Sequence, residues 1–410
     1  MRAVILHRGF RTWGGAEVLA LAQARALRDG GAEVHVVSLE PVAASWGESL
    51  DGLPVHEVPR RHWSDLAFLL DRKARLAHLS ERVGRVLRAL APDVVVAHNH
   101  PAPALLGATA LGARKLWYCH EPPRGLYPRQ THPRLLEASG KGLIAGQQPL
   151  ARALRRDLGR DERGAWNWRG RLDFDQRGVA GLDGVAANSA YTRGSVWAAY
   201  GGLQARVSYP VVEPRAERHL PGIDRTGLQV MVQTRLELVK NVDTVLRAFR
   251  LALPRLGPRP RLHVVGDGSQ RAALEGLAAE LGLGEAVLFH GFLPGDRLRA
   301  LRRVCDVFAF VPWDEPFGLV FPEAAAAGML LVGPDHGGPW EILGGGEFGW
   351  CVPPHSPVAL AEALCAAWRT GDGEADRLRR RAHEACRARF GPDVVLPAFR
   401  AWVGETPFAM

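Results

Sequence analysis

Cysteine is scarce in this chain, and long apolar runs are absent from it. The five cysteines among its 410 residues are scattered, odd in number and without any CxxC pair: Cys119, Cys305, Cys351, Cys365 and Cys386. This pattern argues against a disulfide framework or a zinc site and favours the cytoplasm. No stretch of about 18 uncharged apolar residues occurs, so no transmembrane helix is expected. The opening residues 1–7 are too short for a signal-peptide core and indicate a first strand.

Acidic residues are outnumbered, and the formal net charge is +9. Residues 124–177 hold twelve Lys/Arg against six Asp/Glu, a local charge of +6. Such a surface suits nucleic acid, an anionic membrane or a phosphorylated substrate, although a solvated arginine-rich surface is an equal alternative. Zinc-finger and RNA-binding signatures are missing, so no nucleic-acid partner is expected. A location peripheral to the inner face of a membrane remains an expectation.

The length suits two domains of roughly 200 residues. Short β-branched runs alternate with amphipathic helical patterns, which predicts parallel sheets with helices on both faces. The expected strands are residues 3–7, 33–38, 94–97, 115–118, 184–187, 228–233, 261–265, 286–290, 307–311 and 329–332. The expected helices are residues 16–28, 102–111, 190–200, 242–251, 271–281, 296–302 and 320–327.

The strand–helix pattern restarts near residue 228, after Pro210, Pro214 and Pro221, which mark a linker. We therefore expect a first domain over residues 1–212 and a second over 213–391. Residues 375–404 are helical and broken at Gly391-Pro392, and residues 392–410 should pack back on the first domain. Two doubly wound domains of this kind should face each other across a cleft and bind ligands at the carboxyl ends of their strands. Within residues 124–177, an inserted helix is expected near 149–158.

Two glycine-rich turns follow expected strands. Gly14-Gly15 follows the first strand and opens a helix, where glycine allows close backbone approach and free N–H groups attract an anion. Gly266-Asp267-Gly268 falls short of a full GxGxxG fingerprint. A plain tight turn is the alternative for both.

Two basic residues follow the first strand of the second domain. Arg235 and Lys240 flank a turn that leads into a helix, so both could reach a diphosphate at the helix start. Two such charge-assisted contacts could support diphosphate binding without a metal. The alternative is a pair of surface cations.

Residues 313–323 carry two carboxylates, Glu315 in a loop and Glu323 eight residues later on the next helix. Carboxylates accept paired hydrogen bonds from vicinal hydroxyls of a sugar or ribose. Gly318 frees the backbone, and the helix start can meet phosphate. Gly337-Gly338 follows the next strand, where the opposite wall of the same pocket is expected.

In the first domain, His120 ends a strand on the cleft side, where it could bind a sugar hydroxyl or transfer a proton. His98 and His100 end the neighbouring strand. The three histidines lack metal-ligand spacing, so no metal is expected. A lone histidine is more often structural.

These residues resemble the retaining GT-B glycosyltransferases of family four, over nearly the whole chain. The E-x7-E element of that family is similar to Glu315 and Glu323, its Arg-and-Lys clamp to Arg235 and Lys240, and its cleft histidine to His120. Its N-terminal Gly-Gly loop is similar to Gly14-Gly15. The resemblance implies a GT-B fold: two facing Rossmann-like domains with a C-terminal crossover helix.

The resemblance also implies roles. Glu323 would hold the ribose of a nucleotide sugar, and Glu315 would hold the donor sugar and phosphate. The donor-binding set would further include the base-flanking Phe292 and Leu293, the turn glycine Gly266, and the backbone of Phe317, Gly318 and Leu319. Transfer would retain the anomeric configuration through an oxocarbenium-like ion pair, with the leaving diphosphate deprotonating the acceptor. No cofactor or metal would be required.

Finer phrases, such as residues 118–122 and 208–212, are similar to mannosyltransferases that extend lipid-linked oligosaccharides. They favour GDP-mannose as donor and a glycan or lipid-linked acceptor. The segment 235–240 departs from that subgroup, which leaves the donor base open. A nucleotide-sugar epimerase or phosphorylase of the same fold, and a non-catalytic nucleotide-binding subunit, are the alternative functions.

Overall fold

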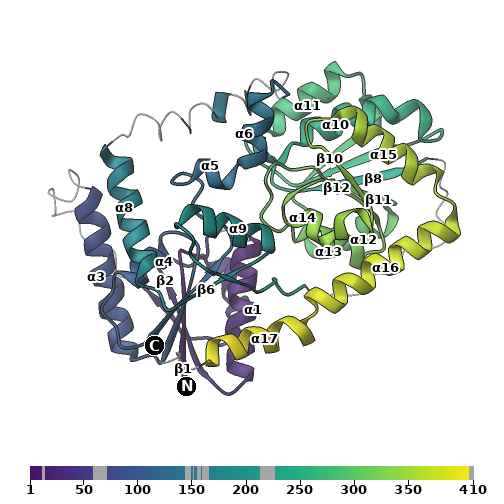
Figure 1. Ribbon diagram of the computed structural model, residues 1–410. Coiled ribbons are helices and arrows are strands. Elements are labelled where there is room, and N and C mark those ends of the chain that lie inside the picture. Colours follow the sequence, from purple (N-terminus) through teal and green to yellow (C-terminus); the bar gives the residue numbers. More distant parts are fainter. Residues whose placement is uncertain are drawn as a thin grey trace. The chain divides into compact units, whose positions relative to one another are not determined.

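The computed structural model describes residues 1–11, 14–58, 72–143, 149–150, 152–154, 158, 166–212 and 227–405. They form two compact units (Figure 1). The first comprises Met1–Thr131, Arg156–Val211 and Pro392–Met410, and the second comprises His132–Arg155 and Val212–Gly391. The segment His132–Arg155 thus clusters with the second unit, whereas the division made from sequence leaves it in the first domain. The predicted linker prolines Pro214 and Pro221 lie outside the described residues.

The first unit is built on a seven-stranded parallel sheet of order β3-β2-β1-β4-β5-β6-β7. Its strands are β1 (Arg2–His7), β2 (Glu33–Ser38), β3 (Val55–Glu57), β4 (Val94–His98), β5 (Arg114–Cys119), β6 (Gly184–Ala187) and β7 (Arg206–Val207). Its helices are α1 (Gly15–Asp29), α3 (Arg72–Leu90), α4 (Ala102–Gly107), α5 (Pro128–Thr131), α8 (Trp166–Ala180), α9 (Ala190–Ala199) and α17 (Pro392–Gly404).

The second unit has a six-stranded parallel sheet of order β10-β9-β8-β11-β12-β13. Its strands are β8 (Gln229–Gln233), β9 (Arg261–Val265), β10 (Val287–Gly291), β11 (Val307–Ala309), β12 (Leu330–Pro334) and β13 (Trp350–Val352). Its helices are α6 (Pro133–Gly140), α10 (Val242–Ala252), α11 (Arg271–Glu280), α12 (Gly295–Val304), α13 (Val320–Ala326), α14 (Gly337–Ile342), α15 (Pro357–Arg369) and α16 (Asp372–Phe390).

Helices cover both faces of the first sheet. Because successive residues of a strand point to opposite sides, each face has its own hydrophobic core. Ala3 and Ile5 of β1 join a core with α1 and α17, and Val4 and Leu6 join a separate core with α3 and α4. Figure 1 shows α17 lying against α1. The predicted α/β class and the return of the last helix to the first unit are therefore confirmed, as is the break at Gly391-Pro392.

One predicted helix is too long. The expected helix over 102–111 ends at Gly107 in the structure. The last residue of the helix packs closely against α8: a Cβ at Gly107 would lie 1.7 Å from the carbonyl oxygen of Gly178. The described residues between 149 and 158 are helical, in agreement with the inserted helix predicted there.

Candidate active site

In the second unit, strand order reverses between β8 and β11, with β9 and β10 on one side and β12 and β13 on the other. Ligands of doubly wound sheets bind at such a switch point, outside the carboxyl ends of the strands. The two loops that start there are residues 234–241, after β8, and residues 310–319, after β11. They carry Arg235, Lys240 and Glu315, so the topology brings the predicted clamp and the first predicted carboxylate to one place.

Lys240 and Glu315 are in direct contact. The Lys240 Nζ donates to Glu315 Oε2 over 2.7 Å, and the two side chains are only 16% and 14% exposed. Arg235 behaves differently: it is exposed, and within the described residues its side chain makes no hydrogen bond or ion pair. The site therefore offers one cation already held beside a carboxylate and one that is open to a ligand.

The backbone around the loop 310–319, which carries Glu315, explains why glycine occupies three positions there. Gly318 adopts a φ of +88°, which only glycine adopts readily. A Cβ at Gly338 would lie 2.3 Å from Phe317 Cα, and the Gly338 N–H donates to the Glu315 carbonyl over 2.9 Å. Gly337-Gly338 thus supports the loop that carries Glu315.

Gly266 likewise allows close backbone packing, here beside the loop 234–241 that carries Arg235 and Lys240. Its φ is +122°, and a Cβ there would lie 1.8 Å from the Thr234 carbonyl oxygen. A Cβ at Gly268 would lie 2.5 Å from the Leu236 carbonyl oxygen. Close approach to residues 234–236 therefore accounts for both glycines, which fix the backbone next to Arg235.

The second carboxylate has a partner that sequence reasoning missed. Arg302, in the last turn of α12, forms an ion pair with Glu323 Oε2 and donates to Gln233 Oε1 over 2.8 Å. Arg302 is 11% exposed, and Glu323 is 37% exposed. The guanidinium orients the carboxylate through one oxygen. The only sequence signal was its place just before β11, since nothing in the spacing links it to Glu323.

Arg302→Ala tests this arrangement. If Glu323 holds ribose hydroxyls with the help of Arg302, the Kd for a nucleoside diphosphate should rise about 10-fold, or about 1.4 kcal/mol of binding free energy. Titration calorimetry with UDP and GDP measures it. Arg299→Ala is the matched control, because Arg299 lies on the same helix and pairs with the exposed Asp296. Wild-type affinity in Arg302→Ala would contradict the role.

The predicted base-flanking residues lie at the edge of the same sheet. Phe292 directly follows the edge strand β10 and is 75% exposed, and Leu293 is half-buried. β9 separates β10 from β8. At about 4.8 Å per strand, the end of β10 lies roughly 10 Å from the end of β8, which is the scale of a nucleoside.

In the first unit, strand order reverses between β1 and β4. His7 ends β1 and His98 ends β4, while His120 follows β5. The Gly9 N–H donates to His7 Nδ1 over 3.0 Å, and His98 Nδ1 lies 3.0 Å from His120 Nε2. The Asn188 side chain donates to the His120 carbonyl over 2.9 Å. The structure therefore places the predicted His120 in a histidine cluster at the switch point.

Burial keeps this cluster neutral. It lowers the pKa of His7 from its usual value near 6.5 to about 4 and that of His120 to about 3. Burial, and then His120, also holds the pKa of His98 well below its usual value. Because His7 Nδ1 accepts from a backbone N–H, its proton sits on Nε2. Neutral rings of this kind bind hydroxyls as donors or acceptors without a charge.

The glycine loop after β1 is partly described. Gly14 precedes α1 in an extended conformation, and α1 begins at Gly15 with Glu17 in its first turn. A Cβ at Gly14 would meet the Glu17 carboxylate at 2.4 Å. Residues 12 and 13 lie outside the described part, so the turn is seen only from Gly14 onward.

Asp314, next to Glu315, anchors α6 to the second unit. Pro133 opens this helix, and Asp314 accepts from the next two N–H groups, those of Arg134 at 3.2 Å and Leu135 at 3.0 Å. These are the donors that a helix leaves unpaired at its start. Asp314 is fully buried, so the two hydrogen bonds tie α6 to the Glu315 loop.

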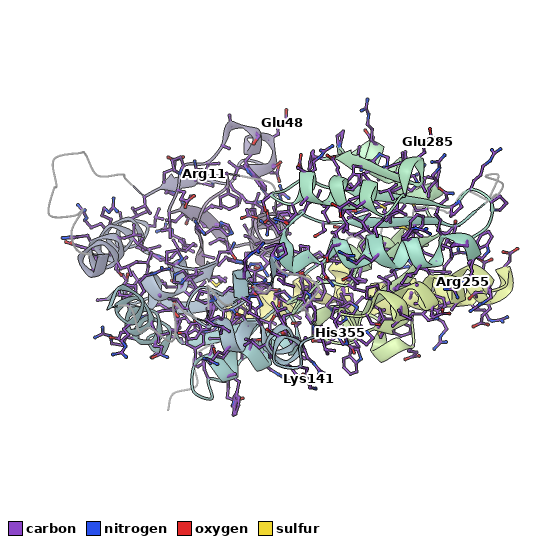
Figure 2. All side chains as sticks on the ribbon, turned by 90° about the horizontal axis from the view of Figure 1, so that it is seen from above. Arg11, Glu48, Lys141, Arg255, Glu285 and His355 are labelled. Carbon is purple, nitrogen blue, oxygen red and sulfur yellow. The ribbon has the colours of Figure 1, made fainter. Side chains whose placement is uncertain are left out.

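A cavity of about 210 Å³ lies beside this anchor. Arg134 of α6 and Lys141, which directly follows this helix, line it together with Trp313, His336 and His355. Figure 2 shows Lys141 and His355 on the same side of the unit. Its lining mixes cations, carboxylates and aromatic rings, so it has no single charge preference.

The described residues lack two features, a metal-binding cluster and a membrane-spanning helix. No three His, Cys, Asp or Glu side chains converge there as they would around a metal ion. None of the helices described has the length and apolarity needed to cross a bilayer. The side chains of Trp166 and Trp168, and much of the basic stretch 124–177, lie outside the described part.

The two halves of the chain match two different protein-family models. Residues 13–214 match the family model described as Glycosyltransferase Family 4, and residues 216–385 match Glycosyl transferases group 1. The D-inositol 3-phosphate glycosyltransferase of Nocardia farcinica is 34% identical over 222 residues, 49% of this chain and 48% of that protein. The protein of the same name from Stackebrandtia nassauensis is 34% identical over 171 residues, 40% of this chain and 38% of that protein. The chain thus spans less than half the length of these curated relatives.

The fold is shared with solved structures. Alr3699/HepE of Anabaena, solved in complex with UDP-glucose, superposes with a TM-score of 0.71 at 19% identity, over 97% of this chain and 98% of that one. Each half of the chain therefore matches a glycosyltransferase family model, and the whole chain has the GT-B fold.

Proposed function

We propose that the protein transfers a hexose from a nucleotide-sugar donor to a glycan or lipid-linked acceptor with retention of the anomeric configuration. The meeting of Lys240 with Glu315 at the switch point of the second unit carries the proposal. A diphosphate competes for the Lys240 ammonium, which leaves the Glu315 carboxylate for sugar hydroxyls. The exposed Arg235 adds a second cation.

The chemistry follows from the placement of charge. As the bond from the anomeric carbon to the phosphate oxygen lengthens, negative charge grows on the leaving diphosphate. Fixed cations aimed at developing charge are usually the largest single contribution to catalysis. The sugar acquires oxocarbenium character, and the acceptor attacks from the side the phosphate leaves, which retains configuration. The phosphate oxygen takes the proton of the attacking hydroxyl, so no metal or further base is required.

Two nucleotide sugars are proposed as donors, in order of preference. GDP-mannose is favoured by the phrases at residues 118–122 and 208–212. UDP-glucose is the second candidate, because HepE, which shares the fold, was solved with it. The inositol phosphate named in the two curated relatives makes D-inositol 3-phosphate a sensible first acceptor.

The test is donor consumption. GDP-mannose, UDP-glucose and UDP-N-acetylglucosamine are each incubated with D-inositol 3-phosphate and with lipid-linked and free glycans, with and without EDTA. We expect nucleoside diphosphate release that depends on an acceptor and is unaffected by EDTA, with an α-linked product by NMR. Isomerised donor without release would indicate an epimerase. Binding without turnover would indicate a non-catalytic subunit, and neither binding nor consumption would refute the proposal.

The basic stretch 124–177 supports a further part of the proposal, contact with an anionic membrane surface that carries the acceptor. Sedimentation with liposomes of anionic lipid at low salt should retain the protein, and neutral liposomes should not. If anionic liposomes retain no more protein than neutral liposomes do, membrane contact is no longer part of the proposal.

A further inference from the structure

The turn after β4 directs neighbouring histidines into two separate networks. His98 contacts His120, and Asn99 lies 3.2 Å from His7 Nε2. His100, two residues past His98, instead turns to α8, where its Nδ1 lies 3.1 Å from Asp175 Oδ1. This turn starts at the switch point of the first unit, so His100 lies where the sheet offers a ligand site.

Asp175 is held by three donors. Its Oδ2 accepts from the hydroxyls of Tyr127 and Tyr200, each at 2.8 Å, and its Oδ1 faces His100. Asp175 is 2% exposed. Burial, followed by the nearby carboxylate, raises the pKa of both tyrosines, which therefore stay protonated and donate. The carboxylate is fixed in position by groups from three separate loop segments of the unit.

This environment fixes the tautomer of His100. A carboxylate oxygen only accepts, so His100 Nδ1 must carry the proton and Nε2 keeps its lone pair in the neutral ring. The His100 side chain is 28% exposed, and Nε2 has no hydrogen-bond partner within the described residues. An oriented imidazole thus presents an acceptor nitrogen at the carboxyl edge of the sheet.

We propose that His100 Nε2 accepts a hydrogen bond from a hydroxyl of the acceptor substrate, and that Asp175 is the positioning residue that sets its tautomer. This inference rests on the proposed function, and it assigns His100 to the acceptor because Arg235, Lys240, Glu315 and Glu323, the residues proposed to hold the nucleotide sugar, lie in the other unit. The ligand class is a polyhydroxylated molecule, whose O–H groups donate. Proton transfer stays with the leaving phosphate.

The competing explanation is that His100 only ties its turn to α8. Two substitutions separate the roles. In His100→Asn the amide group lies where the imidazole Nδ1 lies in the wild type. This variant therefore keeps the hydrogen bond to Asp175 and lacks any acceptor at the place of Nε2. In His100→Gln the amide oxygen lies where the imidazole Nε2 lies in the wild type. This variant therefore keeps the hydrogen-bond acceptor and weakens the hydrogen bond to Asp175.

The experiment measures initial rates against acceptor concentration at saturating donor, using the donor and acceptor that the wild type turns over. We expect His100→Asn to raise the acceptor KM about 10-fold with an unchanged donor Kd, and His100→Gln to stay within about 3-fold of the wild type. His56→Asn is the matched control, because His56 pairs with His35 on β2 and β3, away from this turn. The reverse order, with asparagine active and glutamine impaired, would overturn the proposal.

A second readout does not depend on turnover. Long-range ¹H–¹⁵N NMR of histidine-labelled protein, with His100 assigned from its loss in His100→Gln, should show a proton on Nδ1. Asp175→Asn should shift that signal. A proton on Nε2 in the wild type would overturn the inference while leaving the proposed function intact. A wild type that consumes no donor would instead refute the function, and the inference with it.

Discussion

Lys240→Ala is expected to lower the rate of sugar transfer by roughly 100- to 1,000-fold, the range seen when one preorganised donor to developing charge is removed. Lys240 is the cation that the fold holds in place, through its 2.7 Å contact with Glu315, so its position needs no reorganisation when the diphosphate leaves. The measurement is kcat with a saturating nucleotide sugar. A rate within 3-fold of the wild type would contradict the clamp.

Two companions make that result interpretable. Lys240→Gln keeps a hydrogen-bond donor for the poorly exposed Glu315 without the charge, so it separates loss of charge from loss of folding. It should remain folded and still lose most of the rate. Arg255→Ala is the control: Arg255 pairs with Glu362 at 2.8 Å in the same unit, but both side chains are exposed. Pairs of that kind contribute about 0–1 kcal/mol, so transfer should be unchanged.

Acidification is expected to destabilise the first unit through its buried histidines. His7 is neutral in the folded protein down to about pH 4, whereas in the unfolded chain it takes a proton near pH 6.5. Between these values the unfolded state binds more protons, so stability falls as pH is lowered, by up to about 1.4 kcal/mol per pH unit. The loss from His7 amounts to about 3 kcal/mol and is complete below about pH 4.

His7→Asn tests the source of this dependence. Asparagine offers an oxygen near Nδ1 for the Gly9 N–H and does not titrate. Urea unfolding between pH 6 and 4.5 should show a slope of stability against pH that is flatter by roughly one proton. The control is His78→Asn, because His78 is exposed on α3. Parallel slopes for His7→Asn and the wild type would assign the acid sensitivity to other groups, such as His263 on β9, whose pKa burial also lowers to about 4.

Periodicity predicted the inner strands of both sheets well, because buried parallel strands read as short β-branched runs. The edge strands β3, β7 and β13 were missed, since two or three residues such as Arg206–Val207 leave no pattern to read. Helix α3 was missed although Leu79, Val83 and Leu87 recur at helical spacing and bury against the sheet. That signal was present in the sequence.

The site was predictable where topology decides it. Arg235, Lys240 and Glu315 follow the two strands that flank the reversal of order, so strand order alone brings them together. Pairings between distant segments were not predictable: Arg302 with Glu323, and His100 with Asp175, depend on helix packing. For Gly266 the sequence leaves a ligand contact and a plain turn open, and for Gly338 it predicts only the wall of a pocket; the structure shows that both glycines approach neighbouring backbone closely, which sequence alone does not reveal.

The anchoring of α6 by Asp314 has a consequence for recombination between relatives. A chimera that joins the first 212 residues of one protein to the remainder of another pairs α6 of one parent with Asp314 of the other. Wherever the foreign helix does not bring its N–H groups to this fully buried carboxylate, the hybrid loses two hydrogen bonds directly beside Glu315. Exchange of donor specificity should therefore transplant His132–Arg155 together with Val212–Gly391, as one cassette assembled from two stretches of chain.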